Sequence, residues 1–422
     1  MSAHSGPPTV DADGVLADLA ELAELTGGPG GARRVCWTAE WVAARDLLRG
    51  RLASIGVEDV EIDEAGNLWA RLPGEDGSAP ALALGSHLDS VPAGGPLDGA
   101  LGVMAGLGVL RAWAREGHGR PPRDLVLIDF ADEEGSRFGR SLFGSSAVAG
   151  TLDPAELAGL TDAAGETIAE VLDRCGVDLE RAPRAHRRIG SIGSYLELHI
   201  EQGPVLDAAG ESCSAVSGCA GVERFRLELE GQASHAGTTP MDHRRDAGLA
   251  AAEIALAVEG VARAHGGVGT TGSLALEPGV VTAVAGRAEL AVDLRHPDSG
   301  ELGAMLGDVR DAAGRIAAER DCGLAEHPIW SIEPIPFDPA LVRAAEAAAS
   351  RAGGRASAIA SGALHDAAEM ARRVPVAMVF AASVGGISHA REEDSRDDDL
   401  RAAIAAYGAL AGAVLTEPPG TD

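Results

Sequence analysis

Residues 80–98 read PALALGSHLDSVPAGGPLD, an apolar segment that runs directly into a Gly/Pro-rich loop carrying His87, Asp89 and Asp98. The apolar residues 80–84 predict a buried strand of an α/β sheet. Alternate residues of an extended chain share a face, so His87 and Asp89 can orient one another. One imidazole and two carboxylates at a strand end suit a divalent metal, and they are equally compatible with an Asp-Gly turn beside a solvated histidine.

Three later segments supply side chains of the same chemical kinds: ADEEG at 131–135, ELHIEQG at 197–203 and SGALHDA at 361–367. A single histidine in a strand-like run is more often a packed core residue than a ligand, so each segment says little by itself. Combined, the segments give the candidate ligands His87, Asp98, Glu134, His199 and His365. Such a mixed nitrogen and oxygen set can hold two divalent ions about 3.5–4 Å apart if one carboxylate bridges them.

Composition excludes several classes of protein. The 422 residues include 45% hydrophobic side chains, enough for a sizeable core in two or more domains. A formal net charge of −29 repels polyphosphates, so we expect no nucleic-acid partner. No apolar run reaches the roughly 18 residues that cross a bilayer, and residues 1–14 do not resemble a secretory signal. With five cysteines in no pairing pattern, these features predict a cytoplasmic protein without a membrane partner.

The order of the predicted elements indicates two domains. Strands and helices alternate up to about residue 207, which is typical of an α/β layer around a mixed sheet. From about residue 213 the pattern becomes β-α-β-β-α-β, the ferredoxin-like order. We therefore predict a discontinuous catalytic domain, residues 1–212 and 331–422, and an inserted domain, residues 213–330. A ferredoxin-like unit leaves a sheet edge or face free, so we also expect a homodimer.

Six motifs, in chain order, carry a family resemblance: GSHLDSVPAGGPLDG, DEEGSRFG, ELHIEQGPVL, GQASHAGTTPMDHRRDA, SGALHDA and SVGGISHA. The set resembles the M20-type metal-dependent amidohydrolases. The most similar branch contains N-carbamoyl-L-amino-acid hydrolases, allantoate amidohydrolases and β-ureidopropionases. The resemblance extends from about residue 63 to the C-terminus, and it is far more specific for the family than for the substrate.

The resemblance implies an α/β fold in which a mixed-sheet metallohydrolase domain carries an inserted ferredoxin-like lid and dimerisation domain. It also implies two divalent ions per subunit. His87, Asp98 and His199 would bind one ion, and Asp98, Glu134 and His365 the other. Histidine and carboxylate ligands accept Zn, Mn, Co or Ni, so cellular availability decides which metal is bound.

Glu133 is the expected general base. Alternation turns it away from its neighbour Glu134, and a paired-metal site needs a group that takes a proton from water and passes it to the leaving nitrogen. The resemblance assigns the same role to this position. Asp89 is the expected partner that orients His87, with a turn carboxylate as the alternative interpretation.

The resemblance also implies residues that contact the substrate. His235 would reach the active site of the other subunit and stabilise the oxyanion, while Arg295 would bind the substrate carboxylate. Gln202 and His389 occupy family positions near the substrate. For His235, Gln202 and His389 the ordinary interpretation is a structural hydrogen bond. Thr282 stands where the family has an asparagine that helps Arg295 hold the carboxylate, so the pocket differs from that of a standard carbamoylase.

The leading hypothesis is a dinuclear metal-dependent amidohydrolase that cleaves a linear C–N amide bond. The preferred substrate is a small molecule with a carboxylate and a ureido group, such as an N-carbamoyl amino acid or allantoate. The alternatives are an M20-type aminoacylase or dipeptidase, and a metal-bound binding protein without activity. The intact Glu133 argues against the last alternative.

Overall fold

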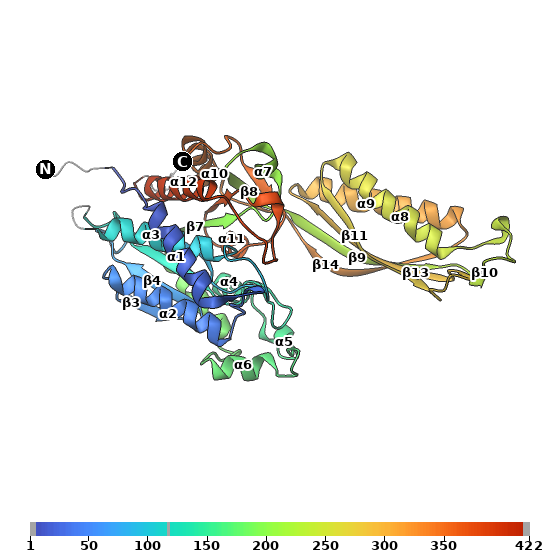
Figure 1. Ribbon diagram of the computed structural model, residues 1–422, viewed down its shortest axis with the longest axis horizontal. Helices are drawn as coiled ribbons and strands as arrows, with labels where there is room; N and C mark the ends of the chain where they lie inside the picture. Colours follow the sequence, from blue (N-terminus) through green and yellow to red (C-terminus); the bar gives the residue numbers. More distant parts are fainter. Residues whose placement is uncertain (1–5, 116–118, 417–422) are drawn as a thin grey trace. The chain divides into compact units, whose positions relative to one another are not determined.

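The computed structural model describes residues 6–115 and 119–416, and the chain divides into two compact units (Figure 1). The first unit comprises Met1–Ser217, Phe337–Ile359 and Ala363–Asp422, and the second comprises Gly218–Pro336 and Ala360–Gly362. The predicted start of the inserted domain at residue 213 falls inside β8 (Cys213–Cys219). Because the first residues of β8 pair with β17 (Val376–Ala381), they belong to the first unit.

A mixed sheet forms the centre of the first unit, with strands in the order β8-β17-β7-β5-β6-β4-β3. The strands β17, β7, β5 and β6 pair in parallel, whereas β8, β4 and β3 pair antiparallel with their neighbours, so the predicted mixed α/β sheet is confirmed. The remaining bounds are β3 Asp59–Ile62, β4 Leu68–Leu72, β5 Ala81–His87, β6 Leu125–Phe130 and β7 Ile192–Ile200.

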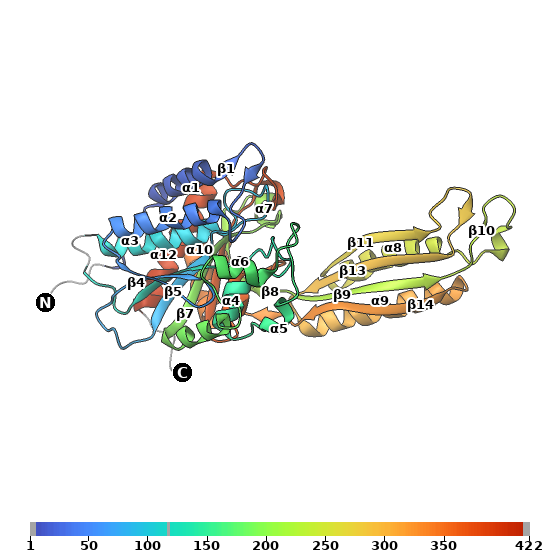
Figure 2. The same ribbon diagram turned by 90° about the horizontal axis from the view of Figure 1, so that it is seen from below.

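Helices pack on this sheet and bury its apolar side chains. One core joins α3 (Ala100–Ala114) and α12 (Asp397–Thr416) to alternate strand residues such as Leu82 and Leu198. Figure 2 shows α1, α2 and α3 on the same side of the sheet. The other helices of the unit are α1 Ala12–Thr26, α2 Ala39–Ser54, α4 Phe143–Ala149, α5 Pro154–Leu157, α6 Ile168–Arg174, α7 Val205–Ala209, α10 Pro339–Arg351 and α11 Asp366–Met370.

Helix α12 is apolar along much of its length, and it bears on the expectation that no apolar run is long enough to cross a bilayer. Within residues 6–115 and 119–416 it is the one helix that passes by length and composition, but 67% of its apolar window is buried. It packs against α10 and β17, and the Tyr407 hydroxyl donates to the Leu196 carbonyl at 3.0 Å. This helix is therefore part of the core of the first unit.

Close packing between β5 and α3 fixes the start of that helix. Gly99, directly before α3, adopts a positive φ of 62°, and a Cβ there would lie 2.4 Å from the carbonyl oxygen of His87. Only glycine tolerates both the backbone conformation and this contact. The glycine therefore brings Asp98 against the end of β5.

The second unit contains an antiparallel sheet in the order β11-β13-β9-β14. Alternate residues of β13 are buried against α8 and α9, as the predicted β-α-β-β-α-β pattern requires. A separate pair, β10 with β12, follows β9 in the fold. The bounds are β9 Gly221–Glu230, β10 Ser234–His235, α8 Ala247–His265, β11 Val268–Glu277, β12 Ala283–Val284, β13 Arg287–His296, α9 Ser299–Glu319 and β14 Gly323–Ile332.

Candidate metal centre

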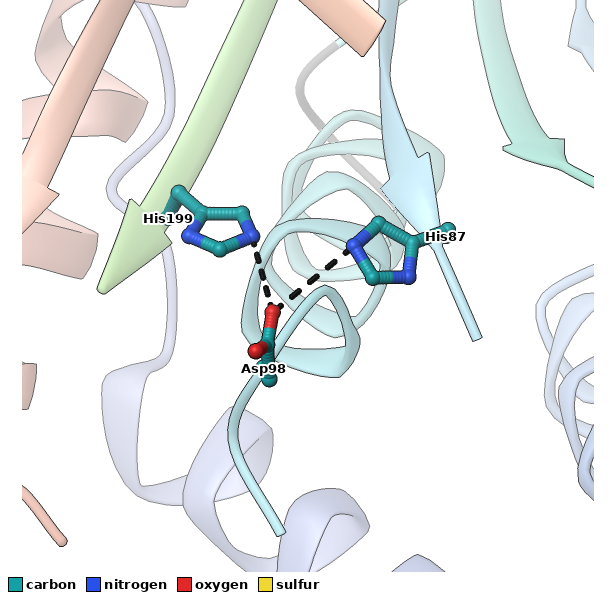
Figure 3. Close-up of side chains that lie close together, drawn as sticks. All are labelled: His87, Asp98 and His199. Carbon is teal, nitrogen blue, oxygen red and sulfur yellow. Dashed lines mark ion pairs between the residues drawn. The ribbon is translucent and has the colours of Figure 1, made fainter. Parts of the chain in front are cut away.

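Two neighbouring parallel strands and one helix start bring three predicted ligands together. His87 ends β5 and His199 lies near the end of β7, while Asp98 comes just before α3. Figure 3 shows both imidazoles pointing at the Asp98 carboxylate. Asp98 Oδ1 lies 3.2 Å from His199 Nε2 and 3.8 Å from His87 Nε2, and all three side chains are buried.

Backbone carbonyls orient both imidazoles. His87 Nδ1 lies 3.1 Å from the carbonyl oxygen of Asp89, and His199 Nδ1 lies 2.9 Å from that of Ile200. A ring that donates from Nδ1 keeps its Nε2 lone pair for a metal. The buried His199 Nε2 has no hydrogen-bond partner. The donor set and this unused atom fit a divalent ion with two imidazole ligands and one carboxylate ligand.

A second group of ligand atoms forms on the other side of Asp98. Asp98 Oδ2 lies 3.5 Å from His389 Nε2, which is 3.6 Å from Glu134 Oε2. One buried oxygen of Glu134, Oε1, has no hydrogen-bond partner. The two oxygens of Asp98 thus face two separate groups, the arrangement that a bridging carboxylate between two ions requires.

His365 does not lie in this second group. It lies with Glu197 and His199, its ring centroid 4.4 Å from that of His199. Glu197 already accepts hydrogen bonds from the Ser86 and Tyr195 hydroxyls and from a backbone N–H. A carboxylate satisfied in this way has little left to offer a metal. The geometry thus assigns to His389 the place that the sequence assigned to His365.

Asp89 connects both ligand groups. Its Oδ1 and Oδ2 accept the backbone N–H groups of Glu133 and Glu134 at 3.3 and 3.2 Å, and Oδ1 lies 3.5 Å from His87 Nδ1. Asp132, the residue before Glu133, adopts a positive φ of 57°. Asp89 thereby orients His87 and also holds the turn that presents the two glutamates, so its role extends beyond the predicted one.

Glu133 and Glu134, in the turn that follows β6, point toward different side chains. Glu133 Oε2 lies 3.7 Å from His87 Nε2, whereas Glu134 faces His389. Burial raises the pKa of Glu133 well above its usual range, although His87 opposes the shift. Burial and the Asp98 charge raise the pKa of Glu134 to about 8. Burial also acts on Asp98, but the adjacent His199 imidazole, 3.2 Å away, holds the pKa of this carboxyl well below the usual range.

Gln202 and Arg34 support the loops of the centre. Gln202, with a positive φ of 57°, donates from Nε2 to Asp98 Oδ2 at 2.8 Å. Arg34 is entirely buried and donates from Nε to the Leu88 carbonyl at 2.8 Å. Sequence reasoning did not single out Arg34, because nothing local distinguishes it from the neighbouring Arg33.

His235 and Thr282 are neighbours in the second unit. His235 pairs with Ala283 across β10 and β12, and the Ala236 N–H donates to the Thr282 carbonyl at 2.9 Å. The His235 ring is exposed, and its Nδ1 accepts the Gly237 N–H at 3.1 Å. In the neutral ring the proton is therefore on Nε2, which is a donor directed away from this backbone contact.

Arg295 lies at the other end of β13. Its guanidinium donates to both oxygens of Asp293, at 2.8 and 3.2 Å, and to the Gly362 carbonyl. Arg295 pairs with Val222 at the start of β9, whereas β10 follows the far end of β9 (Figure 1). The eight residues from Arg287 to Arg295 span about 26 Å. Strand length therefore separates Thr282 from Arg295 within one chain.

Comparisons with known proteins show what the whole chain is similar to. A family model described as peptidase family M20/M25/M40 matches residues 83–413. An N-carbamoyl-L-amino acid amidohydrolase of Geobacillus stearothermophilus is 38% identical over 90% of this chain and 93% of that protein. An allantoate amidohydrolase of Escherichia coli is 34% identical over 88% and 90%. The crystal structure of a hydantoinase/carbamoylase family amidase from Burkholderia multivorans has a TM-score of 0.88 at 34% identity, covering 97% of this chain and 99% of that chain.

We predict two divalent ions per chain and different effects of replacing the two candidate histidines. Asp98→Ala should weaken both ions because its two oxygens face both groups. His389→Ala should remove one ion, whereas His365→Ala should retain both. Metal content after dialysis against buffered Mn, Co or Zn measures this, with circular dichroism as the control for folding. Loss of an ion from the His365 variant but not from the His389 variant would restore the assignment made from sequence.

Proposed function

The chain belongs to peptidase family M20/M25/M40, and we propose that it is a dinuclear metal-dependent amidohydrolase acting on linear ureido groups. The proposed substrates are N-carbamoyl amino acids and allantoate-like molecules, since an N-carbamoyl-L-amino acid amidohydrolase and an allantoate amidohydrolase are similar to most of the chain. The observation that carries the proposal is the Asp98 carboxylate, which has one oxygen toward each of two ligand groups, beside the buried Glu133.

The reaction is the hydrolysis of a C–N bond. Bound divalent ions polarise a carbonyl oxygen and make water more acidic. Glu133 accepts the proton from the attacking water and passes it to the leaving nitrogen. An N-carbamoyl amino acid and one water would yield the free amino acid, ammonia and carbon dioxide.

Arg295 is proposed to bind the substrate carboxylate. Arg224 and Arg295 both donate to Asp293, so the three side chains carry a net positive charge. The Arg295 side chain is also 31% exposed, which leaves donors accessible. A guanidinium binds a carboxylate through two parallel hydrogen bonds, and an ammonium does not.

A homodimer is proposed to complete the active site. β11 is an outer strand of the second sheet, and its side chains Leu274 and Leu276 are 46% and 43% exposed. An uncovered strand of this kind favours pairing with a second copy. His235 and Thr282 lie far from Arg295 within one chain, so a second chain is a natural source of the oxyanion donor and of the polar contact near the carboxylate.

Glu133→Gln should keep both metals and the fold but lower turnover about 10²–10⁴-fold. The amide preserves shape but cannot accept a proton. Ammonia release from a panel of N-carbamoyl amino acids, allantoate, N-acyl amino acids and dipeptides measures the activity and separates the ureidohydrolase from an aminoacylase or dipeptidase. Near-normal turnover by this variant, with its metal content unchanged, would exclude Glu133 as the base.

Arg295→Lys should raise KM about 10- to 100-fold with a smaller change in kcat, since a hydrogen bond to a charged group contributes about 1.5–3 kcal/mol. We also expect weak wild-type activity on simple N-carbamoyl-L-amino acids and better activity on substrates with a different or bulkier acyl or amine part. Thr282→Asn should improve the simple substrates, because an amide has more donors than a hydroxyl. Efficient wild-type turnover of N-carbamoyl-L-methionine, unchanged in Thr282→Asn, would show that the threonine is neutral.

Mixing inactive Glu133→Gln and His235→Ala chains should restore activity if His235 of the partner subunit completes the site. Random subunit exchange makes half of the dimers mixed, each with one intact site, so about a quarter of wild-type activity is expected. Differently tagged chains confirm exchange by native mass spectrometry, and each variant exchanged with itself is the control. No recovery in confirmed mixed dimers would place His235 in the active site of its own chain, or outside any active site.

A further inference from the structure

Four side chains form a closed ring of hydrogen bonds around the bridging carboxylate. Gln202 Nε2 donates to Asp98 Oδ2 at 2.8 Å and to Ser388 Oγ at 2.9 Å. The Ser388 hydroxyl donates to Glu393 Oε2 at 3.4 Å. Glu393 Oε1 then accepts the backbone N–H of Asp98 at 3.1 Å, and that of Leu97 at 3.3 Å. The ring therefore ties the Asp98 carboxylate back to its own backbone.

Glu393 is built into this position. Its side chain is 3% exposed although the adjacent Glu392 is exposed and paired with Arg391. Glu393 also packs directly on the backbone of Gly95, where an added Cβ would lie 2.2 Å from its Oε1. A glutamate is rarely buried without a specific partner. Here its partners are the backbone of the Asp98 loop and the serine next to His389.

The second ligand group depends on such support more than the first. In the first group, backbone carbonyls one or two residues further along the chain orient His87 and His199. His389, in contrast, is on a loop, with a side chain 54% exposed and a positive φ of 54°. Gln202, which also has a positive φ, contacts His389 Nε2 at 3.4 Å. Unfavourable backbone conformations of this kind persist only where surrounding contacts hold them.

We propose that Glu393 is a positioning residue that fixes Asp98 and His389 relative to one another. It acts through hydrogen bonds with Ser388 and Gln202. It thereby sets the affinity of the second group, Asp98, Glu134 and His389, for its ion. The inference rests on the dinuclear centre of the proposed function and assigns a separate residue to the second ion. It also gives Gln202 a structural task in addition to its predicted place near the substrate.

Metal titration of the apoprotein by calorimetry, with Mn or Zn, tests the inference without measuring activity. Glu393→Ala should weaken the second ion about 10- to 100-fold, the usual effect of removing a residue that orients a ligand. The first ion should bind with near wild-type affinity. Glu393→Gln keeps one acceptor oxygen and should show a smaller loss. Glu392→Ala, a change at the exposed neighbour, is the matched control and should bind both ions as the wild type does.

Gly95→Ala provides an independent variant that leaves Glu393 chemically intact. The methyl group would displace the Glu393 side chain, so the second ion should again weaken selectively. Gly30→Ala is its control, because an added Cβ there meets open space. If Glu393→Ala does not fold, Gly95→Ala and Glu393→Gln decide the outcome.

The inference would be overturned if Glu393→Ala and Gly95→Ala bound both ions with wild-type affinity. It would also be overturned if these variants lost affinity for both ions equally. Failure of the proposed function has a different signature. In that case the wild-type protein would bind two ions but hydrolyse no ureido substrate, and the Glu393 variants would still lose one ion selectively. This result would support the positioning role and exclude the proposed activity.

Discussion

The two oxygens of Asp98 face two different groups of ligand atoms, and the surrounding structure serves to keep them there. Oδ1 is directed at two histidines on parallel strands, and Oδ2 at a loop histidine and an amide. A buried carboxylate is unfavourable unless hydrogen bonds or cations compensate it. Gly99 brings the residue against β5, and Glu393 holds its backbone, so both the position and the direction of the carboxylate are determined.

Electrostatics explains why this arrangement suits divalent cations. Five carboxylate side chains gather around the centre: Asp89, Asp98, Glu133, Glu134 and Glu393. Burial raises the pKa of Glu134 to about 8 and that of Glu393 to about 7, and in both the Asp98 charge adds to the shift. Burial is the larger cause of both shifts, and the repulsion that Asp98 adds would be relieved by positive charge nearby. Two divalent ions would supply that charge. The buried guanidinium of Arg34 supplies part of it, since it interacts with the charges of Asp98 and Asp89.

The second unit separates its functional residues along one sheet. The donor His235 and the divergent Thr282 lie together near β10, while the Arg224–Asp293–Arg295 cluster lies at the other end of the strands. This distance within one chain is the physical basis for proposing a shared site in a dimer. It also changes how Thr282 is interpreted, since the residue lies beside His235, the proposed oxyanion donor, and not beside the guanidinium of Arg295 in the same chain.

Sequence alone determined the elements and the chemical types in the centre. The run at 80–84 became β5, and the β-α-β-β-α-β order became the second sheet, because local periodicity reflects which face is buried. Sequence analysis placed His365 among the metal ligands and His389 near the substrate, although both follow short Ser- and Gly-containing segments. Only the tertiary structure separates them, because His365, directly before α11, lies with Glu197 and His199, while His389 lies with Asp98 and Glu134. The Glu393 ring has the same origin: its members are up to 295 residues apart in the chain, and no local pattern encodes their contact.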